Sequence, residues 1–294
     1  MSDVRVFREI DPAARVSPEA RVGPYCVVGP HVTIGPSTEL VGRVSVTGHT
    51  TIGSGNVFED GCVLGSRPQD LKYDGYPTLL LIGHRNHFGR QVTAHIGTEH
   101  GGFLTRIGDG NVFERGVHIA HDCYVDDNTR MGRDVLLAGH IRVHNGAVIE
   151  GLAGLQHFVT VGKYARVGAR TPVRRDVPPY TNFYGENCDH GSPPAVHGVH
   201  EAGLAEARLP ADEERELRQA LQELFDDESA LQTKIEQLVN MGAEGEVAEL
   251  CQFLQRSLQG VYGRYRELFR GVAPPEAETY LPPELKIAIG RAVQ

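Results

Sequence analysis

The residues best suited to chemistry lie in the stretch His118-Ile119-Ala120-His121-Asp122-Cys123. A histidine beside a carboxylate makes a good general base, because the carboxylate can fix the imidazole tautomer and raise its basicity. Gly139 follows His121 by 18 positions. A glycine leaves its backbone N–H open to a bound substrate, where it can stabilise a developing oxyanion. Whether the two residues meet depends on the elements that carry them.

A period of six residues predicts those elements. Every sixth residue of one long stretch is bulky and apolar: Ile107, Phe113, Ile119, Val125, Met131, Leu137, Val143, Ile149, Leu155, Val161, Val167 and Val173. The same period runs from Ile10 to Leu64. A helix has a period of 3.6 and a flat strand a period of 2, whereas a strict six is typical of the hexapeptide repeats of a parallel β-helix. Three such blocks close one triangular coil, with the leading aliphatic side chain inside.

This geometry relates residues that are 18 positions apart, because they lie in one column at a strand spacing of about 4.8 Å. His121, Gly139 and His157 therefore form a column, and His121, third in its block, projects outward. The sequence predicts a general base next to an oxyanion donor. His95, His118 and His140 fall in or beside the same coils. Two alternatives stay open: the histidines only decorate the outside of the coil, or they bind a metal, as in β-helical hydratases.

Insertions near 66–81 and 95–106 interrupt the repeat, and long loops on a rigid scaffold are usually functional. Pro178 and Pro179 end it, because proline stops regular strand pairing. The predicted organisation is a β-helix over 1–185, an ordered linker over 186–208 and a smaller α-helical domain over 209–294. Apolar stripes predict helices from Pro210 to about Phe225, over 229–241 and over 245–270.

Composition excludes several classes of protein. The net charge of −9 is concentrated in residues 201–294, with 18 acidic and 10 basic side chains, so no basic surface for nucleic acid is expected. No apolar run is long enough to insert stably in a membrane. The five scattered cysteines suggest reduced thiols and a cytoplasmic location.

Five motifs, taken in chain order, resemble the UDP-N-acetylglucosamine O-acyltransferases of lipid A biosynthesis: Gly29-Pro30-His31-Val32, Gln69-Asp70-Leu71-Lys72-Tyr73, the stretch 118–123, Leu137-Ala138-Gly139-His140 and Asp176-Val177-Pro178-Pro179-Tyr180. The second and third motifs are specific when found together, whereas bare hexapeptide repeats occur in many transferases. The resemblance implies a left-handed parallel β-helix and a homotrimer with active sites between subunits. It also implies that an acyl group passes from acyl carrier protein to the 3-position of UDP-N-acetylglucosamine, without a cofactor or metal.

The resemblance also implies roles for individual residues. His121 is the base, Asp122 supports it, and the Gly139 N–H stabilises the oxyanion. The implied substrate-binding residues are Gln69, Asp70, Lys72, His95, His118, His140, Gln156, His157 and Ala169, the last at the position thought to limit acyl chain length. One departure concerns the nucleotide phosphates, because Ala205-Glu206 stands where the family has a basic residue; Arg208 is one possible substitute.

Acyl carrier protein is acidic, so its docking surface should be basic. The candidate residues are Lys163, Arg166, Arg170, Arg174 and Arg175. Two further functions remain possible. One is N-acyl transfer to a 3-amino analogue or to another nucleotide sugar. The other is a non-catalytic trimeric scaffold that binds sugar nucleotide.

Overall fold

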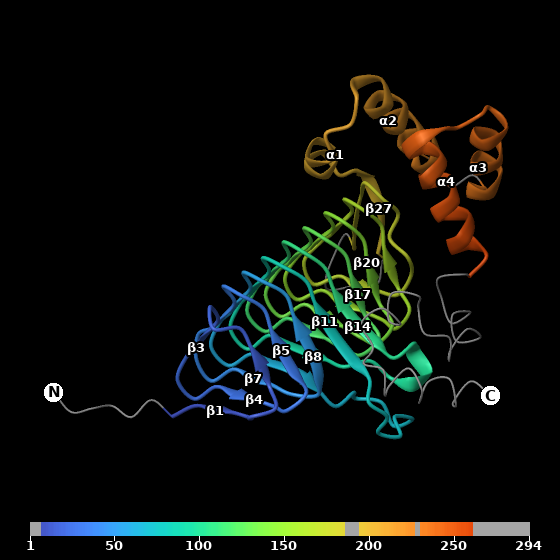
Figure 1. Cartoon of the computed structure of the whole chain (residues 1–294). Helices are drawn as coiled ribbons and strands as arrows, with labels where there is room; N and C mark the ends of the chain where they lie inside the picture. Colours follow the sequence, from blue (N-terminus) through green and yellow to red (C-terminus); the bar gives the residue numbers. More distant parts are fainter. Residues whose placement is uncertain (1–6, 186–193, 227–229, 261–294) are drawn as a thin grey trace.

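The computed structural model describes residues 7–185, 194–226 and 230–260. In this part of the chain, short parallel strands stack into a parallel β-helix, and four α-helices lie at its C-terminal end (Figure 1). This confirms the predicted fold class. No helix in the described ranges has the length and apolar character needed to cross a bilayer.

The coil has three sheets, one for each side of the triangle. Sheet A contains β1 (Glu9–Ile10), β4 (Val27–Val28), β7 (Ser45–Val46), β10 (Val63–Ser66), β13 (Thr93–His95), β16 (His118–Ile119), β19 (Leu136–Leu137), β22 (Gly154–Leu155) and β25 (Pro172–Val173). Sheet B contains β2 (Arg15–Val16), β5 (Val32–Ile34), β8 (His49–Ile52), β11 (Leu79–Ile82), β14 (Leu104–Ile107), β17 (Tyr124–Val125), β20 (Arg142–Val143) and β23 (Thr160–Val161). Sheet C contains β3 (Arg21–Val22), β6 (Glu39–Leu40), β9 (Val57–Phe58), β12 (His87–Phe88), β15 (Val112–Phe113), β18 (Arg130–Met131), β21 (Val148–Ile149), β24 (Arg166–Val167), β26 (Thr181–Tyr184) and β27 (Ala195–Val199).

The leading residues of the repeat fill the interior of the coil. Ile119, Leu137 and Val143 are completely buried, and Phe58 stacks on Phe88 at a ring distance of 4.5 Å. Strand pairing follows the period, since Ile119 is the register partner of Leu137, 18 positions later. The buried column is continuous, so neighbouring coils stabilise one another.

The pairing of strands on either side of each insertion shows how many residues the insertion adds to one coil. Leu79 pairs with His49, 30 positions earlier instead of 18, so the first insertion adds 12 residues. Val112 pairs with His87 across 25 positions, so the second adds 7. The loops are shorter than predicted, because β11 already begins at Leu79 and β14 at Leu104. The second loop contains a 3-10 turn, η1 (Glu99–Gly101).

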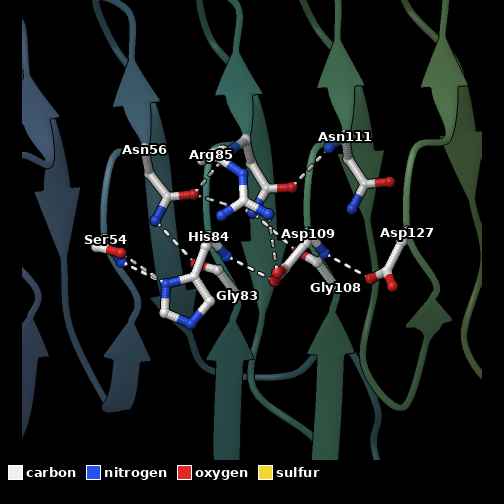
Figure 2. A network of polar contacts seen from close by, with 10 residues as sticks. Ser54, Asn56, Gly83, His84, Arg85, Gly108, Asp109, Asn111 and Asp127 are labelled. Atoms are coloured by element: carbon white, nitrogen blue, oxygen red, sulfur yellow. Dashed lines mark hydrogen bonds and ion pairs between the residues drawn. The ribbon is translucent and has the colours of Figure 1, made fainter.

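Buried asparagines support the corner between sheets B and C (Figure 2). The Asn86 amide donates to Asn56 Oδ1 at 2.9 Å and to the Gly108 carbonyl at 2.9 Å. Its own Oδ1 accepts the Asn111 N–H at 2.8 Å. In the same view, Asp109 Oδ1 accepts the His84 N–H at 2.8 Å. These bonds satisfy turn groups that the short strands leave unpaired.

The predicted linker contains regular structure. β27 pairs antiparallel with β26, and α1 (Glu201–Ala207) follows directly. The remaining helices are α2 (Ala211–Phe225), α3 (Leu231–Asn240) and α4 (Gly245–Leu258). Residues 261–270 of the third predicted helix lie outside the described ranges.

The helices share a second hydrophobic core with the end of the coil. Leu217 and Leu221 of α2 and Leu254 of α4 are buried in it together with Tyr180, which follows β25. Helix α2 begins after Pro210 with Asp212, Glu213 and Glu214 in its first turn, where negative charge complements the helix dipole.

Candidate active site

The candidate site lies at the corner of the coil between sheets A and B. Asp122, His140 and Phe158, 18 positions apart, have left-handed backbone conformations, with φ values of 60°, 65° and 70°. Each bends the chain from one sheet to the next. The preceding residues His121, Gly139 and His157 form the predicted column along this corner. The repeat therefore positions the base, and the bend after it turns Asp122 back toward it.

His121 and Asp122 form a buried pair. Nδ1 of His121 lies 2.8 Å from Oδ2 of Asp122, and the two side chains are 5% and 0% exposed. Because a carboxylate accepts, Nδ1 carries a proton, so in the neutral ring the lone pair is on Nε2. Asp122 therefore lies where it can fix the tautomer of His121.

Thr98, in the second insertion, holds Asp122 in this position. Its backbone N–H donates to Asp122 Oδ1 at 2.8 Å, and its hydroxyl donates to Oδ2 at 2.7 Å. The hydroxyl of Thr105 accepts the Asp122 N–H at 2.8 Å. Gly101 permits this close approach, because a Cβ there would lie 2.0 Å from Asp122 Cγ. Sequence analysis missed these three residues, since they lie in or next to an insertion that does not follow the repeat.

Gly139 lies directly against the imidazole of His121. A Cβ at position 139 would be 2.5 Å from Cε1 and 2.8 Å from Nε2 of His121, so only glycine fits. Among the described residues, no acceptor takes the Gly139 N–H. An available N–H next to Nε2 is the arrangement needed to stabilise an oxyanion beside a general base.

His140 forms the other wall of the site. Its ring stacks on Phe158 at 4.6 Å and meets the His121 ring edge-on at 5.2 Å, and its Nε2 lies 3.8 Å from Asp122 Oδ2. Phe158 was not anticipated, although it lies 18 positions after His140.

The site also has a metal-binding interpretation. His121, Asp122 and His140 offer ligand atoms within 4.8 Å of one another. However, both oxygens of Asp122 already accept hydrogen bonds, two from Thr98 and one from His121. A metal could use only the remaining lone pair of Oδ1, and its charge would compete with the three donors that orient the base. The donor set therefore fits a general base better than a metal centre.

His95 and His118 form a second pair next to the base. Their rings meet edge-on at 5.2 Å. Nδ1 of His95 is 2.7 Å from the Arg67 carbonyl, and Nδ1 of His118 is 2.7 Å from the Thr93 hydroxyl. Burial lowers the pKa of both imidazoles, and for His118 the neighbouring His95 lowers it further. Both are therefore neutral near pH 7.

An elongated cleft of about 700 Å³ opens along this corner across several coils. His121 and Gly139 line it together with four of the other predicted residues: Gln69, His118, Gln156 and His157. Leu136, Gly154 and Pro172 are successive outward-facing positions of sheet A, and they give the cleft an apolar wall. Arg174 stands at the far end.

Of the other predicted substrate-binding residues, His95 and His140 lie beside the base without lining the cleft, and three lie farther away. Asp70 and Lys72 are on the first insertion, where Asp70 Oδ1 accepts the Lys72 N–H at 2.9 Å and the Lys72 side chain is exposed. Ala169 is exposed at a different corner, and its N–H donates to Glu150 at 3.0 Å. None of the three lines the cleft of this chain.

The predicted basic surface for acyl carrier protein is smaller than the sequence suggested. Lys163 is paired with Glu246 and Glu249 of α4, and Arg166 is paired with Glu150. Arg170 and Arg174 are exposed. The acidic partners of Lys163 lie 83 and 86 positions away, and the partner of Arg166 lies 16 positions away, so the cluster of basic residues in the sequence did not reveal these pairs.

Comparison with known proteins identifies the family of the chain. A family model described as "Udp N-acetylglucosamine O-acyltransferase; Domain 2" matches residues 176–262. Among curated relatives, the acyl-[acyl-carrier-protein]–UDP-N-acetylglucosamine O-acyltransferase of Synechocystis sp. is 36% identical over 214 residues, covering 73% of this chain and 75% of the relative. The corresponding protein of Anaeromyxobacter sp. is 37% identical and covers 74% and 82%.

Solved structures give the same result. The structure from Acinetobacter baumannii aligns with a TM-score of 0.76 at 32% identity, covering 86% of this chain and 95% of the other. The UDP-N-acetylglucosamine O-acyltransferase from Moraxella catarrhalis aligns with a TM-score of 0.78 at 31% identity, covering 85% and 95%. The β-helical fold and these matches thus place the chain in the class of hexapeptide-repeat acyltransferases. Within that class, it belongs to the UDP-N-acetylglucosamine O-acyltransferase family.

Proposed function

We propose that this protein moves a fatty acyl group, expected to be 3-hydroxyacyl, from the thioester of acyl carrier protein to the 3-hydroxyl of UDP-N-acetylglucosamine. This is the first step of lipid A biosynthesis. Membership of the family supports the choice of substrates. The buried pair of His121 and Asp122 next to the Gly139 N–H is the observation on which the chemistry rests.

In the proposed reaction, Nε2 of His121 takes the proton of the sugar hydroxyl as its oxygen attacks the thioester carbonyl carbon. The resulting oxyanion accepts the Gly139 N–H. The intermediate then expels the thiolate of the carrier protein, which regains a proton from His121. A thioester is already activated, so a base and an oxyanion donor are sufficient for this transfer.

The cleft fits the two substrates on either side of the base. The apolar wall of Leu136, Gly154 and Pro172 suits an acyl chain, and Gln69, Gln156 and His157 can bond the polar sugar. We assign Asp70 and Lys72 to the sugar nucleotide as well, and Arg170 and Arg174 to acyl carrier protein. Ala169 contacts the acyl chain in this proposal only from a neighbouring subunit.

A homotrimer with shared sites is part of the proposal. Outward-facing Val27 and Val112 are 37% and 41% exposed in the single chain, and a neighbouring subunit would cover such apolar surface. The described thiols of Cys26, Cys62, Cys123 and Cys251 are free and buried, which fits the expected cytoplasmic location.

The decisive experiment is an acyl-transfer assay with UDP-N-acetylglucosamine and its 3-amino analogue, each with acyl carrier proteins of graded chain length. His121→Ala should lower kcat by about 100-fold or more, because general bases contribute about 10² to 10⁴. The matched control is His144→Ala. Nδ1 of His144 lies 2.9 Å from Asp126, so this variant removes a similar pair away from the cleft.

Two outcomes would contradict the proposal. Full activity of His121→Ala would remove the base from the mechanism. Transfer to the amino sugar alone would instead identify an N-acyltransferase.

A further inference from the structure

Glu99, in the 3-10 turn of the second insertion, is a buried acid that the proposed mechanism does not use. It is 8% exposed, and in the described part of the chain no basic side chain pairs with it. Its Oε2 has no hydrogen-bond partner there. Burying a carboxylate without full compensation is unfavourable, so its position calls for an explanation.

The other oxygen of Glu99 binds the first insertion. Oε1 accepts the Asp74 N–H at 2.9 Å and the Tyr76 N–H at 3.2 Å. Both donors lie in the loop between β10 and β11, beyond the residues Gln69, Asp70 and Lys72. Glu99 therefore joins the two insertions, which are 23 to 25 positions apart in sequence.

The adjacent residue connects the same turn to the base. Thr98 donates its backbone N–H and its hydroxyl hydrogen to Asp122, which in turn accepts a hydrogen bond from His121. One short segment thus binds the carboxylate behind the catalytic base through Thr98 and the first insertion through Glu99. At the start of that insertion, Gln69 lines the cleft.

We propose that Glu99 is a positioning residue, which fixes the first insertion against the catalytic corner so that its polar side chains meet the sugar nucleotide. The inference rests on the proposed function for its substrate. Other bonds also order the loop: at its end the Thr78 hydroxyl donates to the Gly97 carbonyl, and within it the Arg67 guanidinium donates to the Tyr73 carbonyl at 3.3 Å. Glu99 binds its middle, so loss of Glu99 should loosen the loop without unfolding the coil.

The test compares Glu99→Ala, Glu99→Gln and Glu114→Ala in the full chain. Glutamine keeps an oxygen that can accept both N–H groups and removes only the charge. Glu114 is an exposed acid that accepts the Arg133 N–H at 2.9 Å on another corner, so it controls for loss of an acceptor elsewhere. Two measurements are made on each variant: hydrogen exchange of residues 70–78, and steady-state kinetics with UDP-N-acetylglucosamine.

For Glu99→Ala we expect exchange of the Asp74 and Tyr76 amides to be about tenfold faster, since each loses one hydrogen bond worth roughly that factor. We expect KM for the sugar nucleotide to rise about tenfold. We expect kcat to stay within about threefold, because Thr98 still holds Asp122. Glu99→Gln and Glu114→Ala should behave like the wild type. Unchanged exchange in Glu99→Ala would overturn the proposal, as would a fall in kcat at constant KM. If the wild type did not use this sugar nucleotide, the proposed function would fail, while the exchange data would still test the contact.

Discussion

The carboxylate of Asp122 accepts three hydrogen bonds, and they explain why the base is so well oriented. Two come from Thr98 and one from Nδ1 of His121. The side chain is completely buried, so water does not compete for these bonds. The sequence predicted the pairing of His121 with Asp122 because the two residues are adjacent. It could not predict Thr98, because its position depends on the path of a loop.

The contact between Gly139 and His121 gives a direct prediction at the residue scale. Gly139→Ala places a Cβ 2.5 Å from His121 Cε1, so the imidazole must move and the oxyanion donor is obstructed. We expect kcat to fall by about 100-fold or more, in line with the loss of an oxyanion donor. Assays at saturating substrate measure this. Gly42→Ala is the control, because its Cβ would meet nothing closer than 3.5 Å. Equal activity of the two variants would contradict the role of Gly139.

His95 and His118 predict how stability depends on pH. Burial lowers the pKa of each below the ordinary 6.5, so below pH 6.5 the unfolded chain binds more protons than the folded one. Stability from these groups is complete above pH 6.5 and is lost as the pH falls toward the folded-state values. Each histidine contributes at most about 1.4 kcal/mol per pH unit.

Thermal melts between pH 8 and 5 test this dependence. Replacing His95 and His118 together by glutamine should flatten the fall in Tm, whereas His31→Gln, at an exposed position, should not change it. An equally steep fall in the double variant would show that other groups cause the acid sensitivity.

At the scale of elements, the six-residue period predicted most of the coil. It fixed which aliphatic residues point inward, and it placed Gly139 beside His121, because stacked coils repeat every 18 residues. The insertions escaped the same reasoning. Their lengths were overestimated because strands β11 and β14 begin three residues before the apolar positions Ile82 and Ile107, at which the six-residue repeat resumes.

The buried asparagines at the corner between sheets B and C give a prediction for an element. Asn86→Leu would leave the Asn111 N–H and the Gly108 carbonyl without their present partner, while Asn56 Oδ1 would keep only the Asn86 backbone N–H. Each unpaired buried group costs about 1–3 kcal/mol, so the two groups together should cost about 2 kcal/mol or more, measured as a lower Tm. Ser54→Ala removes a hydroxyl that contacts the exposed His84 at 2.8 Å and should change Tm little. A similar Tm for both variants would mean that the asparagines contribute no special stability.

For the whole molecule, the uneven charge of the sequence acquires a structural meaning. Part of the acidic C-terminal region neutralises basic residues of the coil, as Glu246 and Glu249 do for Lys163 and as Glu206 does for Arg130 at 3.2 Å. Sequence reasoning assigned Lys163 to a docking surface because the partners lie more than 80 positions away. The acidic helices are therefore attached to the coil partly by charge.

Substitution of Lys163 tests whether charge attaches the helices to the coil. Its Nζ donates to Glu246 Oε1 at 2.8 Å, and the Tyr180 hydroxyl donates to Oε2 of the same carboxylate at 3.0 Å. Burial opposes the charge of Lys163, but the bonds to Glu246 and Glu249 outweigh it, so the pKa of Lys163 is raised and it remains charged at neutral pH. Lys163→Met removes the cation and leaves Glu246, whose side chain is 15% exposed, without its charge partner.

We expect this substitution to weaken the attachment of α4 to the coil by about 2–3 kcal/mol, slightly less than for a fully buried pair. Faster hydrogen exchange in α4, with exchange in β13 to β22 unchanged, would show the effect. Glu249→Gln is the matched control, because the Glu249 side chain is 62% exposed and an exposed ion pair contributes at most about 1 kcal/mol. If Lys163→Met and Glu249→Gln exchanged at the same rate as the wild type, apolar packing around Tyr180 would be sufficient to hold the helices in place.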